Sequence, residues 1–240
     1  MRSVFVQVDI GDPVIFNRQH KAFAVSQEFY TQIGQKSLGL SGPLPELNTE
    51  YVDLLKAAYE ANPAWSNKGP FQAQPPSSLT AGKLIIRLLE DKAPKAAENF
   101  RCLCSGEKGI GKSSKKLLHY KGCNFHRIVK GFVCQGGDIV QGDGSGGDSI
   151  YGGKFNDDKA ALKLKHGSIG AVSMANSGKN SNTSQFFVTL APASKCDGKH
   201  VVFGEVTEGL DVLQRIDEEA ASADGIPRVP VVISDCGIVK

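Results

Sequence analysis

The second half of this chain consists of short apolar runs separated by glycine-rich turns. Five such runs follow one another: Asn124–Val129, Phe132–Gln135, Ile169–Ala175, Gln185–Leu190 and Val201–Val206. Each is too short for an ordinary helix, and short strands with turn signals between them are typical of an all-β barrel or sandwich. A last apolar run, Val229–Ile233, predicts a closing strand.

Two more strands and two helices are predicted around this region. Val4–Ile10 alternates like a strand and ends at a Gly-Asp-Pro turn signal, and Gly82–Leu89 is a second strand candidate. Pro94 suits the first turn of a helix, and the spacing of the apolar residues after it predicts a helix over Pro94–Cys104. The same spacing predicts a helix over Leu210–Ala221.

Residues 14–81 differ in character from the rest of the chain. An Asn-Thr pair precedes a predicted helix over Glu50–Ala61, and Ser26–Gln35 is a weaker helix candidate. Gln72–Thr80 has the composition of a proline-rich linker. We therefore predict one domain formed by residues 1–13 and 82–240, with a small helical subdomain, 14–81, inserted in its first hairpin.

Two glycine-rich stretches match nucleotide-binding patterns. Gly106–Ser113, GEKGIGKS, fits the phosphate-binding P-loop, and Gly142–Gly147 fits the G-x-G-x-x-G pattern of dinucleotide folds. A P-loop needs a buried strand before it and a helix after it, and the predicted elements supply neither. A dinucleotide fold also needs a helix after its glycines, and Asp148–Gly153 is unsuited to one. We predict that both are loops and that the chain binds no nucleotide.

The cysteines, the N-terminus and the net charge argue against several other classes of protein. Six cysteines at irregular spacing indicate reduced thiols, and Cys102-x-Cys104 and Cys123-x-x-His126 lack a second pair at zinc-finger spacing, so no metal site is expected. The N-terminus lacks a secretory signal and no segment is long and apolar enough to span a membrane, so a cytoplasmic or nuclear location is expected. The formal net charge is only +3. A basic run from Lys108 to Lys130 fits a solvated loop, with an acidic partner as the alternative.

One constellation carries the functional signal. It is spread over FHRIVKGFVCQGGD (125–138), GAVSMANSG (170–178), SQFFVTL (184–190) and DGKHVVFG (197–204). These segments combine the cation of Arg127 with aromatic residues and with uncharged hydrogen-bonding groups: Phe132, Phe187, Gln135, Asn176 and Gln185. The mixture suits a neutral, extended ligand with an apolar side chain. It contains neither paired carboxylates nor an activated nucleophile, so hydrolysis is not indicated.

Together with SIYGGKF (149–155), these segments resemble the cyclophilin family of peptidyl-prolyl cis-trans isomerases, in the family's order and from about Gly82 to Lys240. The resemblance implies a mainly β fold: a closed, eight-stranded antiparallel barrel capped by two helices. It implies isomerisation of X-Pro bonds without a cofactor, on proline-containing peptides and proteins. A rival interpretation is a proline-peptide binding or chaperone module with little turnover.

The resemblance also implies roles for individual residues. Arg127 would donate a hydrogen bond to the prolyl amide, and the proline ring would lie in a pocket of Phe132, Val133, Phe187 and Cys196. Gln135, Asn176 and His200 would hold the peptide backbone. Further substrate-binding positions are Ala175, Ser177, Gln185 and Lys195.

Three departures from the common family pattern carry expectations of their own. Lys195 stands where the family usually has Trp, so cyclosporin binding is expected to be weak. The loop Lys108–Tyr120 resembles that of the divergent-loop cyclophilins, in which cysteines at the positions of Cys104 and Cys236 form a redox pair; two buried thiols are the alternative. The insertion 14–81 either binds an unknown protein or is a packed, tolerated addition.

Overall fold

The computed structural model, which describes residues 2–239, divides into two compact units. The residues up to Gly11 and those from Thr80 onward form the larger unit, and Asp12–Leu79 forms the smaller one. Each unit has its own cluster of buried apolar side chains. No helix among the described residues is long and apolar enough to cross a membrane.

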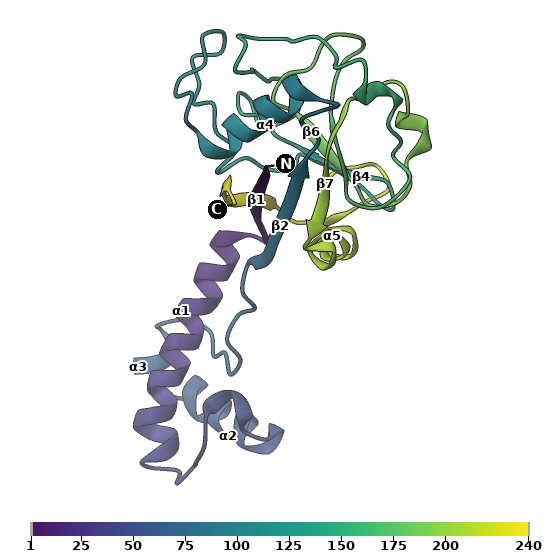
Figure 1. The fold of residues 1–240 in the computed structure, drawn as a ribbon. Helices are drawn as coiled ribbons and strands as arrows, with labels where there is room; N and C mark the ends of the chain where they lie inside the picture. The colour runs from purple at the N-terminus through teal and green to yellow at the C-terminus, as the bar shows by residue number, and fades with distance from the viewer. Residues whose placement is uncertain (1, 240) are drawn as a thin grey trace. The chain divides into compact units, whose positions relative to one another are not determined.

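The larger unit is one antiparallel sheet of eight strands that curls around a core (Figure 1). Its strands are β1 (Ser3–Ile10), β2 (Thr80–Leu88), β3 (Arg127–Val129), β4 (Val133–Gly136), β5 (Ala171–Met174), β6 (Phe186–Thr189), β7 (Val202–Glu208) and β8 (Val231–Ile238). Their order is β3-β4-β6-β5-β7-β2-β1-β8. The chain just before β3 bridges to β8 at Asn124 and Val232, where the Phe125 amide donates to the Val231 carbonyl and the Ile233 amide to the Cys123 carbonyl, both at 2.8 Å. The sheet is therefore a curled half-barrel, and its closure stays a prediction.

The alternating pattern read from the sequence places the core. In β1, Val4, Val6, Val8 and Ile10 all point inward and are at most 6% exposed, as expected for a strand with one buried face. An aromatic cluster fills the space that the sheet encloses, with the rings of Phe100 and Phe186 in edge-to-face contact at 5.0 Å.

Helices α4 (Pro94–Ser105) and α5 (Leu210–Arg215) lie at opposite ends of the curled sheet (Figure 1). Both were predicted, but α5 changes into a wider π-helical turn over Ile216–Ala220. The N-terminus of α4 has no local side-chain cap. Instead, Asp158 accepts hydrogen bonds from the amides of Lys95 and Ala96, at 3.1 and 2.9 Å.

The smaller unit is helical, and the turn predicted at Gly-Asp-Pro was wrong. Helix α1 spans Pro13–Phe29 and continues as a π-helix over Tyr30–Gln35, so the weak candidate Ser26–Gln35 is only its end. The predicted turn at Gly-Asp-Pro is the start of this helix, because the Asp12 side chain accepts from the amides of Val14 and Ile15. The remaining helices are α2 (Thr49–Glu60) and α3 (Pro63–Ser66).

The core of the smaller unit is aromatic. The ring of Phe29 packs edge-on against those of Tyr59 and Trp65, with distances between ring centres of 5.1 and 5.4 Å. The stretch predicted as a linker has no regular structure before β2, but it is anchored within this unit. The amide of Gln72 donates to the Ser26 hydroxyl at 2.8 Å, and the Gln74 side chain donates to the Pro45 carbonyl.

Candidate functional site

Four neighbouring strands carry a row of side chains on one face of the sheet. Arg127 in β3 pairs with Gln135 in β4, Gln135 pairs with Phe187 in β6, and Phe187 pairs with Ser173 in β5. Directly paired residues of antiparallel strands share a face. The residues beside them point the other way, since Ile128, Cys134 and Val188 belong to the core. Because side chains alternate between the two faces of each strand, Arg127, Gln135, Phe187 and Ser173 lie in one row on the same face.

A hollow of about 150 Å³ lies over this row. The structure brings nine of the predicted site residues to its walls: Arg127, Phe132, Val133, Gln135, Ala175, Asn176, Phe187, Cys196 and His200. Val133, Ala175, Phe187, Ala193 and Cys196 form a small apolar cluster, with Phe132 packed against it. The hollow can thus hold a small apolar group beside polar side chains at its rim.

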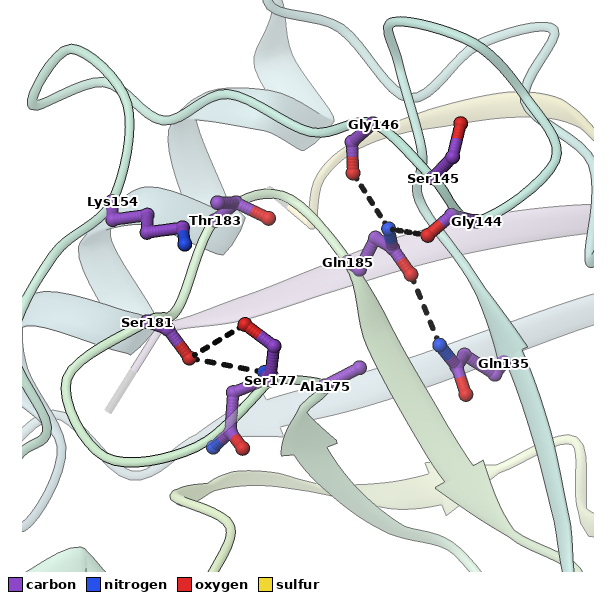
Figure 2. A pocket seen from close by; sticks show the side chains of 11 residues that line it. Gln135, Gly144, Ser145, Gly146, Lys154, Ala175, Ser177, Ser181, Thr183 and Gln185 are labelled. Carbon is purple, nitrogen blue, oxygen red and sulfur yellow. Dashed lines mark hydrogen bonds between the residues drawn. The ribbon is translucent and has the colours of Figure 1, made fainter.

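A second hollow of about 260 Å³ shares Gln135, Ala175 and Asn176 with the first. Ser177 and Gln185 line this hollow and not the first one. Its other lining residues were not predicted as site residues from the sequence: Gly144, Ser145, Gly146, Lys154, Ser181 and Thr183. Figure 2 shows Lys154 and Gln135 on opposite sides of it.

The polar groups at the rim are oriented by their partners. The Gln135 Nε2 donates to the Gln185 Oε1 at 3.0 Å (Figure 2), which leaves the Gln135 carbonyl oxygen available. The Asn176 Nδ2 donates to the Lys199 carbonyl at 3.1 Å. Among the described residues, the exposed guanidinium of Arg127 has no hydrogen-bond or ion-pair partner. Its donors are therefore free for a ligand.

His200 is held in one tautomer. Its Nδ1 lies 3.0 Å from the Met174 carbonyl, which can only accept, so Nδ1 carries the proton. Burial lowers the pKa of His200. The ring is consequently neutral at physiological pH, and its Nε2 is an acceptor.

The loop matched to the dinucleotide pattern supports the site. Buried Asp138 accepts from the amides of Val140, Gln141, Gly144 and Gly146. Burial raises the pKa of Asp138, but these four bonds outweigh it and the net shift is downward. The carbonyls of Gly144 and Gly146 accept from the Gln185 Nε2 at 2.8 and 2.6 Å. The loop thereby orients Gln185 toward Gln135.

Close packing explains the glycines of this loop. A Cβ on Gly144 would lie 2.6 Å from the His126 Nε2, and one on Gly147 would lie 2.4 Å from the Thr183 hydroxyl. Both glycines also have positive φ, 93° and 141°. The glycine pattern was a usable signal for this loop, although its resemblance to a phosphate site pointed elsewhere.

The structure contains a Ser-His-Asp arrangement that spacing alone did not reveal. His166 Nδ1 lies 2.9 Å from Asp197 Oδ1, and its Nε2 lies 2.7 Å from the Ser173 hydroxyl. Ser173 and His166 are both 0% exposed, so the hydroxyl cannot reach a substrate as a nucleophile would. The His166 ring stacks on Phe187 at 5.6 Å. The arrangement therefore holds Phe187 in the wall of the 150 Å³ hollow.

Lys195 extends over the rim and does not line either hollow. It belongs to a short 3₁₀ turn, Ser194–Cys196, and its ammonium lies 3.6 Å from the centre of the Phe132 ring. This is a cation–π contact. The resemblance predicts a rigid indole ring at this position, and a flexible, charged lysine side chain takes its place.

The predicted redox cysteines lie together at a separate place. Cys104 and Cys236 are both buried and are free thiols in this structure. Burial raises the pKa of Cys104, and a hydrogen bond from Cys104 lowers that of Cys236. The Cys236 Sγ also lies 3.5 Å from the His119 Nε2.

The loop 106–120 lacks the geometry of a phosphate-binding loop. It begins at Gly106, the left-handed cap of α4, so a helix and not a strand precedes it, and none of its residues after that is helical. Asp148 holds it by accepting from the amide and hydroxyl of Ser114, at 2.9 and 2.7 Å.

One cluster of the described residues has the side-chain types of a metal site. The ligand atoms of Glu98, Cys102 and Glu107 lie within 4.8 Å of one another. Arg101 donates to both carboxylates, at 2.8 and 2.7 Å. Burial raises the pKa of Cys102 to about 12. The cluster is therefore better described as an arginine held by two carboxylates beside a protonated thiol.

Comparisons with known proteins point to one family. The family model described as cyclophilin type peptidyl-prolyl cis-trans isomerase/CLD matches residues 77–238. A peptidyl-prolyl cis-trans isomerase, cyp11, from Rhizopus delemar is 51% identical over 156 residues, which cover 65% of this chain and 46% of that protein. The chain thus spans about half the length of this curated relative. All residues of both hollows lie within the matched range, whereas β1 and residues 12–76 lie outside it.

Proposed function

The chain belongs to the cyclophilin-type peptidyl-prolyl cis-trans isomerase family, and we propose that it catalyses cis-trans isomerisation of X-Pro bonds in peptides and proteins. The observation that carries the proposal is the 150 Å³ hollow, because it joins an apolar cluster to the unpaired guanidinium of Arg127. A proline ring matches the apolar part, and the amide next to it reaches the polar rim.

Isomerisation needs neither a proton transfer nor a covalent step. Rotation about an X-Pro bond breaks amide resonance against a barrier of about 18–20 kcal/mol, and uncatalysed exchange takes tens of seconds or more. An enzyme accelerates it by binding the twisted amide more tightly than either planar form. The prolyl nitrogen becomes more basic as resonance is lost, so a hydrogen-bond donor beside it stabilises the twisted state selectively.

The chain supplies these groups on one face of the sheet. Phe132, Val133, Phe187 and Cys196 hold the ring, and Arg127 donates to the prolyl amide. The free Gln135 oxygen, Asn176 and the Nε2 of neutral His200 bind the peptide backbone on either side. Ala175, Ser177 and Gln185 line the rest of the binding surface, and Lys195 lies at its rim over the Phe132 ring.

A protease-coupled or NMR exchange assay on an Ala-Pro peptide tests the proposal. We expect turnover by the wild-type chain and a loss of about 100-fold or more in kcat/KM for Arg127→Ala. Arg87→Ala is the matched control, since Arg87 is an exposed arginine paired with Glu205 on the same unit. Peptide binding by NMR without any turnover would instead establish the proline-peptide binding module or chaperone as the function.

We also propose that Cys104 and Cys236 form a redox pair in the manner of the divergent-loop cyclophilins. The hydrogen bond between the thiols and the nearby His119 support it. Formation of the disulfide releases two electrons and two protons to an added oxidant such as a disulfide reagent. A mass loss of two hydrogens on mild oxidation, absent in Cys104→Ser, is the expected result; no mass change leaves two buried thiols.

We also propose finer features of the fold and of its setting. The half-barrel closes between β8 and the chain before β3, which the Asn124–Val232 bridge supports. The unit Asp12–Leu79 is an insertion in the first hairpin, since β1 and β2 pair as antiparallel neighbours on either side of it. This unit binds a protein partner, and the chain works in the cytoplasm or the nucleus.

A further inference from the structure

A third hollow extends the binding surface. It has a volume of about 560 Å³ and shares Asn176 and His200 with the 150 Å³ hollow, which in turn shares Asn176 with the 260 Å³ hollow. The three hollows therefore meet around Asn176. We call the surface that they form the prolyl groove; a peptide that places its proline in the middle hollow would extend toward the other two.

Cations stand along the whole prolyl groove. Arg127 lines the middle hollow, Lys154 the second, and Lys179 and Lys199 the third. Lys195 joins them through its contact with the Phe132 ring. Among residues 2–239, no carboxylate forms an ion pair with any of these five side chains, whereas nearby Lys130 and Lys165 are paired with Asp217 and Asp197.

Little negative charge opposes these cations. Asp157 is the one carboxylate among the residues that line the three hollows. It already accepts from the Asn182 side chain at 2.7 Å and from the Asn180 amide at 2.9 Å. Asp197 lies two residues after Lys195, but its carboxylate already accepts from the ring and the amide of His166. With Asp157 counted against the five cations, the groove carries a formal charge of +4, whereas the entire chain carries +3.

We propose that the prolyl groove selects proline-containing segments whose flanking residues carry anionic side chains. This rests on the proposed isomerase function. A groove lined by one sign of charge attracts and orients a ligand of the opposite sign, and the unpaired cations lose no existing ion pair when the ligand binds. Both carboxylates and phosphorylated side chains have the required charge.

The test compares matched peptides around a central Ala-Pro, with Glu, Gln or Lys at the flanking positions. At low ionic strength we expect kcat/KM for the Glu peptide to exceed that for the Gln peptide by about threefold to tenfold, with the Lys peptide lowest. The differences shrink as salt is added, because the cations are exposed to solvent. A phosphoserine peptide in the same series shows which anion is preferred, and a gain for either anion over Gln supports the proposal.

Charge variants locate the effect. Lys179→Gln with Lys199→Gln is expected to reduce the Glu-to-Gln ratio toward one, and Lys199→Glu to lower it further. Lys108→Gln with Lys112→Gln, in the exposed loop outside the groove, is the matched control and should keep the wild-type ratio. Each ratio is measured within one variant, so a general loss of activity does not affect it.

Equal kcat/KM for the Glu and Gln peptides at low ionic strength overturns the proposal while leaving the isomerase function intact. If no peptide is turned over, the isomerase function fails, and NMR titration with the same peptides decides this proposal separately. In that case tighter binding of the Glu or phosphoserine peptide supports the anionic preference, and equal binding rejects it.

Discussion

Lys195 is the residue that most distinguishes this binding surface from the usual family pattern. Its ammonium lies 3.6 Å from the Phe132 ring centre, where a Trp would offer a flat apolar face and an N–H donor. We predict weak inhibition by cyclosporin and a gain of at least tenfold in affinity for Lys195→Trp, measured by titration of isomerase activity. Nanomolar inhibition of the wild-type chain would contradict the prediction.

A second prediction concerns His200 and pH. Burial lowers its pKa, so the folded protein keeps the neutral ring below the ordinary value of 6.5. We expect kcat/KM to be flat from pH 8 to about 6.5 and to fall only below it, as the ring becomes protonated and Nε2 ceases to accept. The free energy of unfolding should fall in the same range, since the unfolded chain takes up this proton first. An acid limb that begins above 6.5, or one that persists in His200→Gln, would show that another group controls the profile.

At the level of single residues, the sequence was informative where a side chain belongs to a long motif. Arg127, Gln135 and Phe187 were named from it, and the strand register brings them side by side. His166 and Ser173 were missed because their role depends on contacts between residues that are far apart in the sequence. No spacing rule links the buried ring of His166 to the Ser173 hydroxyl in β5 and to the Phe187 ring in β6.

Among the elements, the loop from Asp138 to Gly147 carries the clearest prediction. Asp138→Ala leaves four amides without their acceptor in a buried place, so the free energy of unfolding should fall by about 2–4 kcal/mol. Because the loop carbonyls orient Gln185, KM should rise as well. Asp138→Asn, which keeps the shape and one oxygen, should be intermediate in both chemical denaturation and steady-state kinetics.

A contrary result for Asp138 would be equally clear. If Asp138→Ala lost stability but kept the wild-type KM, the loop would support the fold without orienting the site. Asp158→Ala is a matched control, because it removes another buried carboxylate that accepts backbone amides, at the start of α4 and outside the three hollows. It should lower stability while leaving KM unchanged.

Element boundaries show what local pattern can and cannot predict. Strands with one buried face, such as β1, follow directly from alternation. The start of α1 did not, because Gly-Asp-Pro serves equally as a turn and as a helix cap, and its neighbours Val14 and Ile15 are exposed and give no apolar face. The cap of α4 was also beyond local pattern, since Asp158 supplies it from 62 residues away.

For the whole molecule, the separate cores of the two units lead to a deletion experiment. Replacing Asp12–Leu79 by a short glycine-rich turn would restore an ordinary hairpin, because Val8 pairs with Gly82 and Asp9 with Thr80. All residues of the three hollows and of the main core belong to the larger unit. We therefore expect kcat/KM on Ala-Pro peptides to stay within about threefold of wild type, with a cooperative thermal transition retained.

Replacing Trp65 by Ala in the full chain, which opens the core of the smaller unit, is the companion variant and should leave the same activity. A folded deletion variant that has lost most of its activity would show that the smaller unit acts on the site, and the division into an isomerase unit and a separate helical unit would have to be abandoned.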